Sequence, residues 1–418
     1  MDILLTWLLF MLLFLAIGYI LGARRKPGER IAADSDLTSE ATLLPALQER
    51  IMPVLAVAGQ QAHPAGFLFE GKLRTNPQDA LAQLTREFAP DNFTPLIEEG
   101  DRPGRVKVAL LRGIEQLAPT STEAERPNWS VHVLLFVLTL ATTTWAGALH
   151  AGVDLLREPA RFAVGLPYSL GLMLILGAHE LGHYFAAKHH GIRVTPPYFI
   201  PVPFALGTFG AFIKLKSLSP NRRASFDVAV AGPLAGLVFA IPALLIGLKY
   251  SHVVPGSTAS DMLHTGVQVG SSFLLAILTR ISLGADTIAG HQLMLHPLAF
   301  AGWLGLFVTA LNLLPIGQLD GGHIASSLFG SRRGHLISLG ALITLFALAL
   351  FVWPGLMMWA WIVWFIAGTR DVPPLNDITP VNPTRRALAW FAFLLLAAIM
   401  IPVPHALYPT FGIHCPYL

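Results

Sequence analysis

Long apolar segments recur along this chain. From Trp129 onward, seven of them approach or reach the roughly 20 residues that a helix needs to cross a bilayer. They occupy residues 131–149, 167–188, 225–248, 294–316, 335–352, 355–368 and 387–403. An eighth, residues 1–23, is followed by basic residues. A removable signal peptide carries its positive charge first, so we expect a retained transmembrane anchor there. The pattern predicts a polytopic α-helical membrane protein with about eight transmembrane helices.

One polar block, residues 24–128, interrupts this pattern. Alternation of apolar and polar positions predicts strands at Gly66–Arg74 and Arg105–Leu111, and helical periodicity predicts a short amphipathic helix at Asn76–Phe88. We therefore expect a small soluble α/β module at 24–128, followed by a multi-pass membrane domain over residues 129–418.

Composition supports the bilayer as the main solvent. The 418 residues are 54% hydrophobic and 13% charged, with a mean hydropathy of +0.59. The net charge is only +3 and the basic residues are scattered, which argues against nucleic acid as a partner. The single cysteine, Cys415, excludes an internal disulfide and a thiolate metal cluster. Nitrogen and oxygen atoms must therefore hold any metal.

Basic residues are distributed unequally between the two sides of the predicted topology. Segments 186–224, 317–334 and 369–386 hold eleven Lys and Arg residues, whereas the opposite side holds four: Arg157, Arg161, Lys249 and Arg280. The positive-inside rule assigns the richer side to the cytoplasm. The soluble module is then cytoplasmic.

The segment Val194–Ser219 fits neither a spanning helix nor a polar loop, because it contains four prolines and then an alternating, glycine-spaced stretch from Leu206 to Leu218. Non-helical backbone at membrane depth is tolerated only where protein or a water-filled cavity covers it. A re-entrant β-hairpin beside a cavity fits that requirement, and an ordinary surface loop is the alternative.

Residues His179-Glu180-Leu181-Gly182-His183 form an H-E-x-x-H pattern inside a predicted spanning helix. Positions four apart on a helix point within 40° of each other, so both imidazoles can reach one ion beside Glu180. A charged residue costs roughly 2.5 to 3.5 kcal/mol at the centre of a membrane helix, so it indicates a functional site. The alternative is a set of polar residues that only pack helices together.

A catalytic zinc ion takes three protein ligands and leaves one position open. His189 lies six residues after His183, the spacing of a soluble metalloprotease pattern, but Ala186 stands where that pattern has a turning glycine. We therefore interpret His189 and His190 as a solvated helix end. Asp320 is the better candidate, because its segment and that of His179 both end near the cytoplasmic side. From the position of its segment alone, Asp320 could equally be the exposed carboxylate of an Asp-Gly turn.

Together, Gly177–His183 and the sequence from Asn312 through Pro315 to Leu319-Asp320-Gly321 resemble the site-2 protease family of intramembrane metalloproteases. That family carries H-E-x-x-H and a downstream N-x-x-P-x-x-x-L-D-G. The resemblance covers roughly residues 165–330 and is greatest to the cyanobacterial, plastid and bacterial branch with a soluble N-terminal module. It implies one Zn²⁺ per chain, bound by His179, His183 and Asp320.

The resemblance also implies that Glu180 activates water and that membrane proteins with transmembrane segments are the substrates. We expect Asn312 to donate its amide to substrate or oxyanion, and His323 to be a polar helix start rather than a partner of the site. The expected location is the bacterial cytoplasmic (inner) membrane, with the active site near the cytoplasmic side.

Two other functions use the same residues differently. An ion or solute transporter could place polar groups in the membrane, but no inverted repeat is found between the two halves of the chain. A catalytically silent scaffold on a protease fold has no need of Glu180. The pattern therefore favours regulated intramembrane proteolysis.

Overall fold

The computed structural model describes residues 43–63, 65–112, 127–203, 206–255, 272–284, 291–351 and 356–401. The chain divides into two compact units, Met1–Ile114 and Glu115–Leu418, which are considered separately below. The predicted anchor at 1–23 and Cys415 lie outside the described residues, and the predicted domain boundaries remain predictions.

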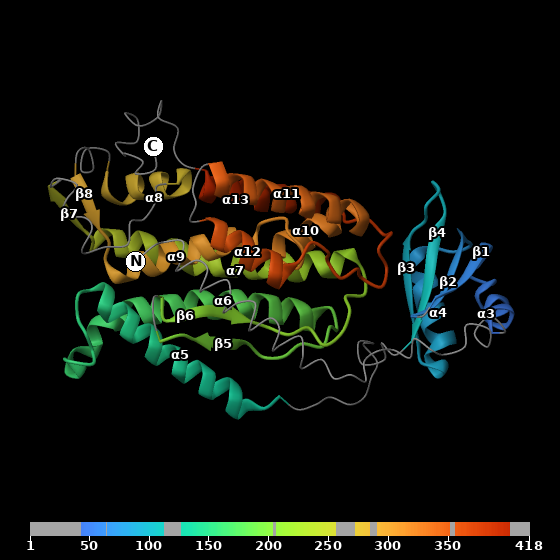
Figure 1. The fold of residues 1–418 in the computed structure, drawn as a ribbon, viewed down its shortest axis with the longest axis horizontal. Helices are drawn as coiled ribbons and strands as arrows, with labels where there is room; N and C mark the ends of the chain where they lie inside the picture. Colours follow the sequence, from blue (N-terminus) through green and yellow to red (C-terminus); the bar gives the residue numbers. More distant parts are fainter. Residues whose placement is uncertain are drawn as a thin grey trace. The chain divides into compact units, whose positions relative to one another are not determined.

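The first unit is a small α/β module (Figure 1). Its four-stranded antiparallel sheet has the order β1-β2-β4-β3. The elements in chain order are α3 (Leu44–Ile51), β1 (Leu55–His63), β2 (Gly66–Leu73), α4 (Pro77–Phe88), the short 3-10 helix η1 (Ala89–Asp91), β3 (Phe93–Glu99) and β4 (Val106–Arg112). The two predicted strands and the predicted helix are confirmed to within one residue at each end. The sequence pattern did not predict α3, β1 and β3.

Helix α4 shows how local sequence builds this module. The side chain of Asn76 accepts hydrogen bonds from the backbone N–H groups of Gln78 and Asp79, which caps the helix, and Pro77 fits its first turn. The side chains that recur every four residues, Ala80, Leu84 and Phe88, are all buried. Helix α4 contacts β3, and the sheet residues Phe69 and Ile97 are fully buried in the same module.

The second unit is mainly helical. Its elements are α5 (Trp129–His150), η3 (Pro159–Gly165), α6 (Leu166–His189), β5 (Tyr198–Pro201), β6 (Thr208–Phe212), α7 (Arg222–Lys249), β7 (His252–Pro255), α8 (Phe273–Leu283), β8 (His291–Met294), α9 (Pro297–Asn312), α10 (Asp320–Phe329), α11 (Ser331–Phe351), α12 (Leu356–Ala367) and α13 (Pro383–Met400).

Within the described residues, five helical segments are long and apolar enough to cross a membrane: α5, η3 with α6, α7, α11 and α13. The apolar helices α8, α9 and α12 are shorter. The unit is therefore a polytopic helical membrane protein. Helix α8 was not predicted, and the predicted segment 294–316 contains a helix only over Pro297–Asn312, because Met294 belongs to β8.

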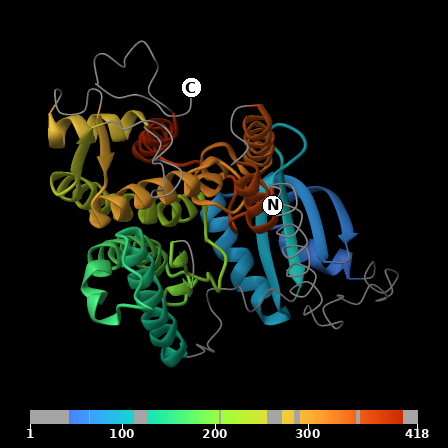
Figure 2. The same cartoon turned by 60° about the vertical axis from the view of Figure 1, so that its left-hand side comes forward.

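Helix α7 lies beside both α6 and α9 (Figure 1), and these neighbours remain adjacent after the 60° turn of Figure 2. Small residues allow the close approach. A Cβ on Gly182 of α6 would lie 2.5 Å from the carbonyl oxygen of Ala231, and one on Gly302 of α9 would lie 2.5 Å from the backbone nitrogen of Leu244. Helices in lipid associate through such contacts, because burial of apolar side chains gives little driving force there.

The segment after α6 forms a two-stranded antiparallel hairpin, β5 with β6, in the register Tyr198↔Phe212 and Phe199↔Ala211. An antiparallel bridge between Val194 and Leu215 extends the pairing toward its base. Side chains of α5 and α6 hold the hairpin through hydrogen bonds to its backbone. These bonds join His132 Nδ1 to Pro197 O, Thr142 Oγ1 to Gly207 O, and Tyr168 Oη to Leu206 O.

The contact between α7 and α9 gives a prediction about stability. Gly302→Ala should lower the melting temperature of the detergent-solubilised protein, because the new methyl group has no room beside Leu244 and overpacking costs about 1–3 kcal/mol. Gly340→Ala is the matched control, since a Cβ there meets nothing within 4 Å and alanine is the better helix former. Equal melting temperatures for the two variants would contradict this packing.

Candidate metal centre

Helix α6 carries His179 and His183 one turn apart, and both side chains are buried. Their Nε2 atoms lie 3.1 Å from each other. This follows from helix geometry, in which positions four apart share a face. The helix continues through Ala186 to His189, which is exposed, so the prediction that His189 is not a ligand agrees with its place at the helix end.

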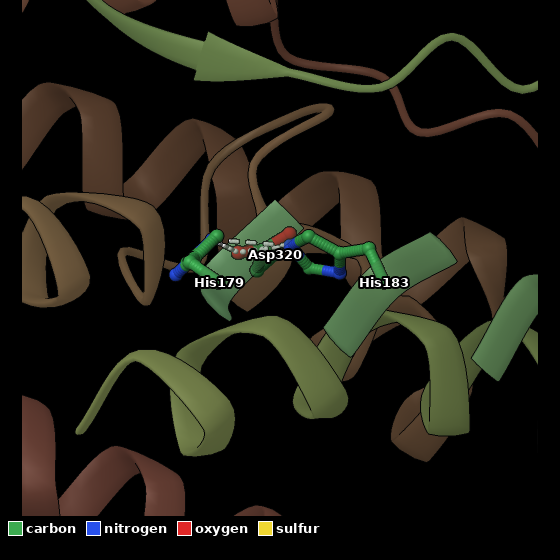
Figure 3. Close-up of side chains that lie close together, drawn as sticks. All are labelled: His179, His183 and Asp320. Atoms are coloured by element: carbon green, nitrogen blue, oxygen red, sulfur yellow. Dashed lines mark hydrogen bonds and ion pairs between the residues drawn. The ribbon is translucent and has the colours of Figure 1, made fainter. Parts of the chain in front are cut away.

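Asp320 is the first residue of α10 and reaches the same point from another part of the chain. Its Oδ2 atom lies 3.4 Å from the Nε2 atom of His179 and 3.4 Å from that of His183. Figure 3 shows the three side chains pointing toward one another. The structure therefore brings together the three residues that the sequence predicted as ligands.

Glycines shape the turn that carries Asp320 to the histidines. Gly317 has a φ of +50°, a left-handed conformation, and its backbone N–H donates to Ser338 Oγ. A Cβ on Gly321 would overlap the carbonyl oxygen of Leu313, and one on Gly322 would overlap that of Gly317. The chain can leave α9 and start α10 at this short distance only because these side chains are absent.

A second helix orients the histidines. The Nδ1 atom of His183 lies 2.7 Å from the carbonyl oxygen of Val228 on α7, so Nδ1 carries the proton and donates it. The lone pair of His183 is then on Nε2, facing His179 and Asp320. Gly232 and Gly236 of α7 lie against the two rings. A Cβ on Gly232 would overlap the ring of His183, and one on Gly236 would lie 3.3 Å from the Cβ of His179.

These donors fit a zinc ion. Zinc bonds of 2.0–2.2 Å to nitrogen and oxygen in a tetrahedron place the ligand atoms roughly 3.3 to 3.5 Å apart. The observed separations are 3.1, 3.4 and 3.4 Å. Asp320 Oδ2 is buried and accepts no hydrogen bond from the described residues. A buried carboxylate oxygen without a donor is costly, and a cation between the three atoms would satisfy it.

Two further predicted site residues lie at this centre. The amide nitrogen of Asn312, the last residue of α9, lies 3.2 Å from His179 Nε2. Glu180 is 6% exposed and its carboxylate accepts a hydrogen bond from the backbone N–H of Ile213, just beyond β6. The hairpin therefore contacts the carboxylate that the sequence singled out as a base.

One sequence interpretation was incomplete and another was wrong. His323 is more than a polar helix start, because its Nδ1 atom lies 2.6 Å from Oδ1 of the buried Asp371 in the segment between α12 and α13. His190 is not solvated: it is half-buried, and its Nε2 atom lies 2.9 Å from Asp227, which also binds Arg385.

The sequence reasoning also missed the contribution of α7. The spacing Gly232-x-x-x-Gly236 is the small-residue pattern of closely packed membrane helices and could have indicated that this helix lies against the site. The carbonyl of Val228 and the N–H of Ile213 could not have been found in this way, because any residue type supplies those groups.

The fold and the centre define a class: a polytopic membrane protein with a His, His and carboxylate metal site beside a buried glutamate. The sequence profile described as peptidase family M50 matches residues 167–353. "Probable zinc metalloprotease EGY1, chloroplastic" of Arabidopsis thaliana is 32% identical over 83% of this chain and 68% of its own length. The chain belongs to peptidase family M50, the site-2 protease family of intramembrane zinc metalloproteases, and its cofactor is zinc.

Other relatives agree. The protein of the same name from Oryza sativa subsp. japonica is 31% identical over 83% of this chain and 64% of its own. "Probable zinc metalloprotease EGY2, chloroplastic" of Arabidopsis thaliana is 29% identical over 84% of this chain and 62% of its own. The chain thus spans about two thirds of these relatives, and no solved structure matches it.

Two expectations change with these comparisons. The transporter alternative has no support, because the family and the named relatives are metalloproteases. The expected bacterial cytoplasmic membrane also gains no support, since the names of the relatives place them in chloroplasts. The apolar helices still identify the chain as an integral membrane protein, without indicating which membrane contains it.

The contact between α7 and the two rings predicts unequal effects of two similar substitutions. Gly232→Ala should weaken zinc binding about 10- to 100-fold, because the methyl group displaces the ring of His183. Gly236→Ala should have a much smaller effect, since its methyl group would lie 3.3 Å from His179, a close contact that a shift of a few tenths of an ångström relieves. Zinc affinity is measured by competition with a chelator. Equal losses in the two variants would contradict the assigned contacts.

Proposed function

We propose that this chain hydrolyses peptide bonds in or near the transmembrane segments of other membrane proteins, with His179, His183 and Asp320 as the zinc ligands. The observation that carries the proposal is the meeting of these three donor atoms, at tetrahedral spacing, beside a buried glutamate in an apolar helix. A purely structural cluster would need neither three donor atoms at this spacing nor the buried Glu180.

The residues divide the chemistry between them. When bound, zinc acts as a Lewis acid that lowers the pKa of water and polarises the scissile carbonyl. Glu180 takes the proton from the attacking water and returns it to the leaving amine. The N–H of Ile213 holds the Glu180 carboxylate in one orientation. Asn312 donates its amide to the oxygen that gains charge during attack.

The hairpin supplies a means of presenting the substrate. A transmembrane helix must unwind before it is cut, because a helical backbone keeps its carbonyls in internal hydrogen bonds. An unwound segment can pair with a strand by β-addition. In support, the base of the β5–β6 hairpin lies against the side chain of Glu180. In this proposal the hairpin is re-entrant and forms one wall of the path by which water and substrate reach the site.

The proposed topology has eight spans. To the five long helical segments it adds the shorter helices α9 and α12. The eighth span is the predicted anchor at 1–23, which lies outside the described residues. Helix α9 has 16 residues and a length of roughly 24 Å, less than a full bilayer core, and it continues through the turn to Asp320. The charge asymmetry supports an active site near the cytoplasmic side and a soluble module on the same side. The proposed substrates are single-pass membrane proteins.

Replacing the proposed base tests the division of roles. Glu180→Gln removes the proton acceptor and keeps the size of the side chain, so cleavage should fall by at least about 10² to 10⁴ while bound zinc stays at one per chain. Cleavage is followed on gels, and zinc by elemental analysis of the purified protein. Full proteolysis by this variant would show that another group is the base.

Replacing strand residues with proline tests the hairpin. Phe212→Pro and Lys214→Pro should each impair cleavage while leaving zinc bound, because proline removes backbone N–H groups and disturbs the strand. The measurements are initial cleavage rates and zinc content on the same preparations. Unchanged turnover in both variants would remove the proposed role of the hairpin in substrate pairing.

A further inference from the structure

Lys214 occupies a defined place at the base of the hairpin, one residue beyond Ile213. Its backbone N–H donates to Thr195 Oγ1 at 3.0 Å, and its carbonyl accepts from the N–H of Thr195 at 3.0 Å. The N–H of Lys216 likewise donates to the carbonyl of Arg193 at 2.7 Å. Both lysines thus direct their backbone groups toward the neighbouring 193–195 segment.

Ile213 precedes Lys214, and Leu215 lies between the two lysines. The backbone groups of Ile213 and Leu215 point to the opposite edge of the strand. Along an extended strand, successive residues direct their backbone groups to alternate edges and their side chains to alternate faces. The N–H and carbonyl groups of Ile213 and Leu215 therefore lie on the other edge. Glu180 lies at that edge, since it binds the N–H of Ile213. The N–H of Ile213 stays with Glu180, so a substrate strand would pair there through the carbonyl of Ile213 and the N–H and carbonyl of Leu215. Its own side chains then lie on the two faces, and one of these faces carries Lys214.

The charge of Lys214 is not balanced within the described part of the chain, where this exposed side chain has no carboxylate partner. Other described carboxylates of the membrane unit are engaged elsewhere. Asp227 binds His190 and Arg385, Asp371 binds His323, and Asp377 binds Arg222. Asp320 and Glu180 belong to the metal centre. The ammonium group of Lys214 therefore lies at the edge of the site without a carboxylate partner among the described residues. A substrate could supply that partner.

We infer that Lys214 determines specificity by favouring substrates with Asp or Glu in the extended segment that pairs along the Ile213–Leu215 edge. This inference rests on the proposed function. Opposite charges on neighbouring strands attract and like charges repel, each by an amount that changes an equilibrium about two- to fivefold. An acidic residue next to Lys214 should raise kcat/KM by that factor over glutamine, and a lysine should lower it by a similar factor.

A charge exchange tests the inference directly. The probe is a single-pass apolar peptide with a glycine-containing flank, reconstituted in neutral lipid vesicles with the zinc-loaded full chain. Each position around the cut carries Glu, Gln or Lys in turn. The wild type should prefer Glu over Lys at alternate positions on one face. Lys214→Glu should reverse this order, and Lys214→Gln should abolish it.

Lys188→Glu is the matched control. Lys188 is another exposed cation near the end of α6, where its ammonium lies 4.8 Å from the ring centre of Tyr184. This variant should retain the wild-type preference. A preference that Lys214→Glu leaves unchanged, or that Lys188→Glu alters as strongly, overturns the inference.

Binding of the same probes to the Glu180→Gln variant separates this inference from the proposed function. Photo-crosslinking yields should follow the order Glu, Gln, Lys and reverse when Lys214→Glu is added. If binding to the Glu180→Gln variant depends on probe charge but the wild type hydrolyses none of the probes, the proteolytic function is contradicted and the role of Lys214 is not. Equal binding of all three probes would contradict the role of Lys214 alone.

Discussion

The close approach of α6 and α7 is the constraint on which the rest of the site depends. Glycines at 182, 232 and 236 let the two helices meet at backbone distance, and this contact gives His183 the carbonyl of Val228 as its partner. That hydrogen bond fixes the proton on Nδ1 and leaves Nε2 free to bind metal. A bulkier helix interface would separate the carbonyl from the ring, and the ligand set would lose its orientation.

The buried and half-buried carboxylates of the membrane unit are also held by specific partners. Asp227, Asp371 and Asp377 each lie within 3 Å of a basic side chain. These contacts join the end of α6, α7, α10, the segment before α13 and α13 itself. Removing one partner of a buried ion pair is costly, so such pairs fix the ends of the helices relative to one another. Asp320 differs, because its buried Oδ2 atom lies 3.4 Å from each of two imidazole nitrogens, a spacing that suits ligands of one zinc ion better than a direct ion pair. This arrangement marks the metal site.

Much of the site could be predicted because its chemistry is local. His179, Glu180 and His183 follow from helix periodicity, and Asp320 from a second motif at the same predicted depth. Helix α8 was missed because it has only 11 residues, and β3 because Pro95 interrupts its pattern. Partners that act through the backbone, such as Val228 and Ile213, depend on tertiary packing. So does the contact of His323 with Asp371, which are 48 residues apart along the chain.

In the proposed site, two histidines of α6 and the first residue of α10 bind one zinc ion. Anomalous diffraction at the zinc absorption edge, from crystals of the purified protein, locates that ion. We expect one anomalous peak between His179 Nε2, His183 Nε2 and Asp320 Oδ2, and its loss in the Asp320→Ala variant. A peak elsewhere, or an unchanged peak in that variant, would contradict the proposed site.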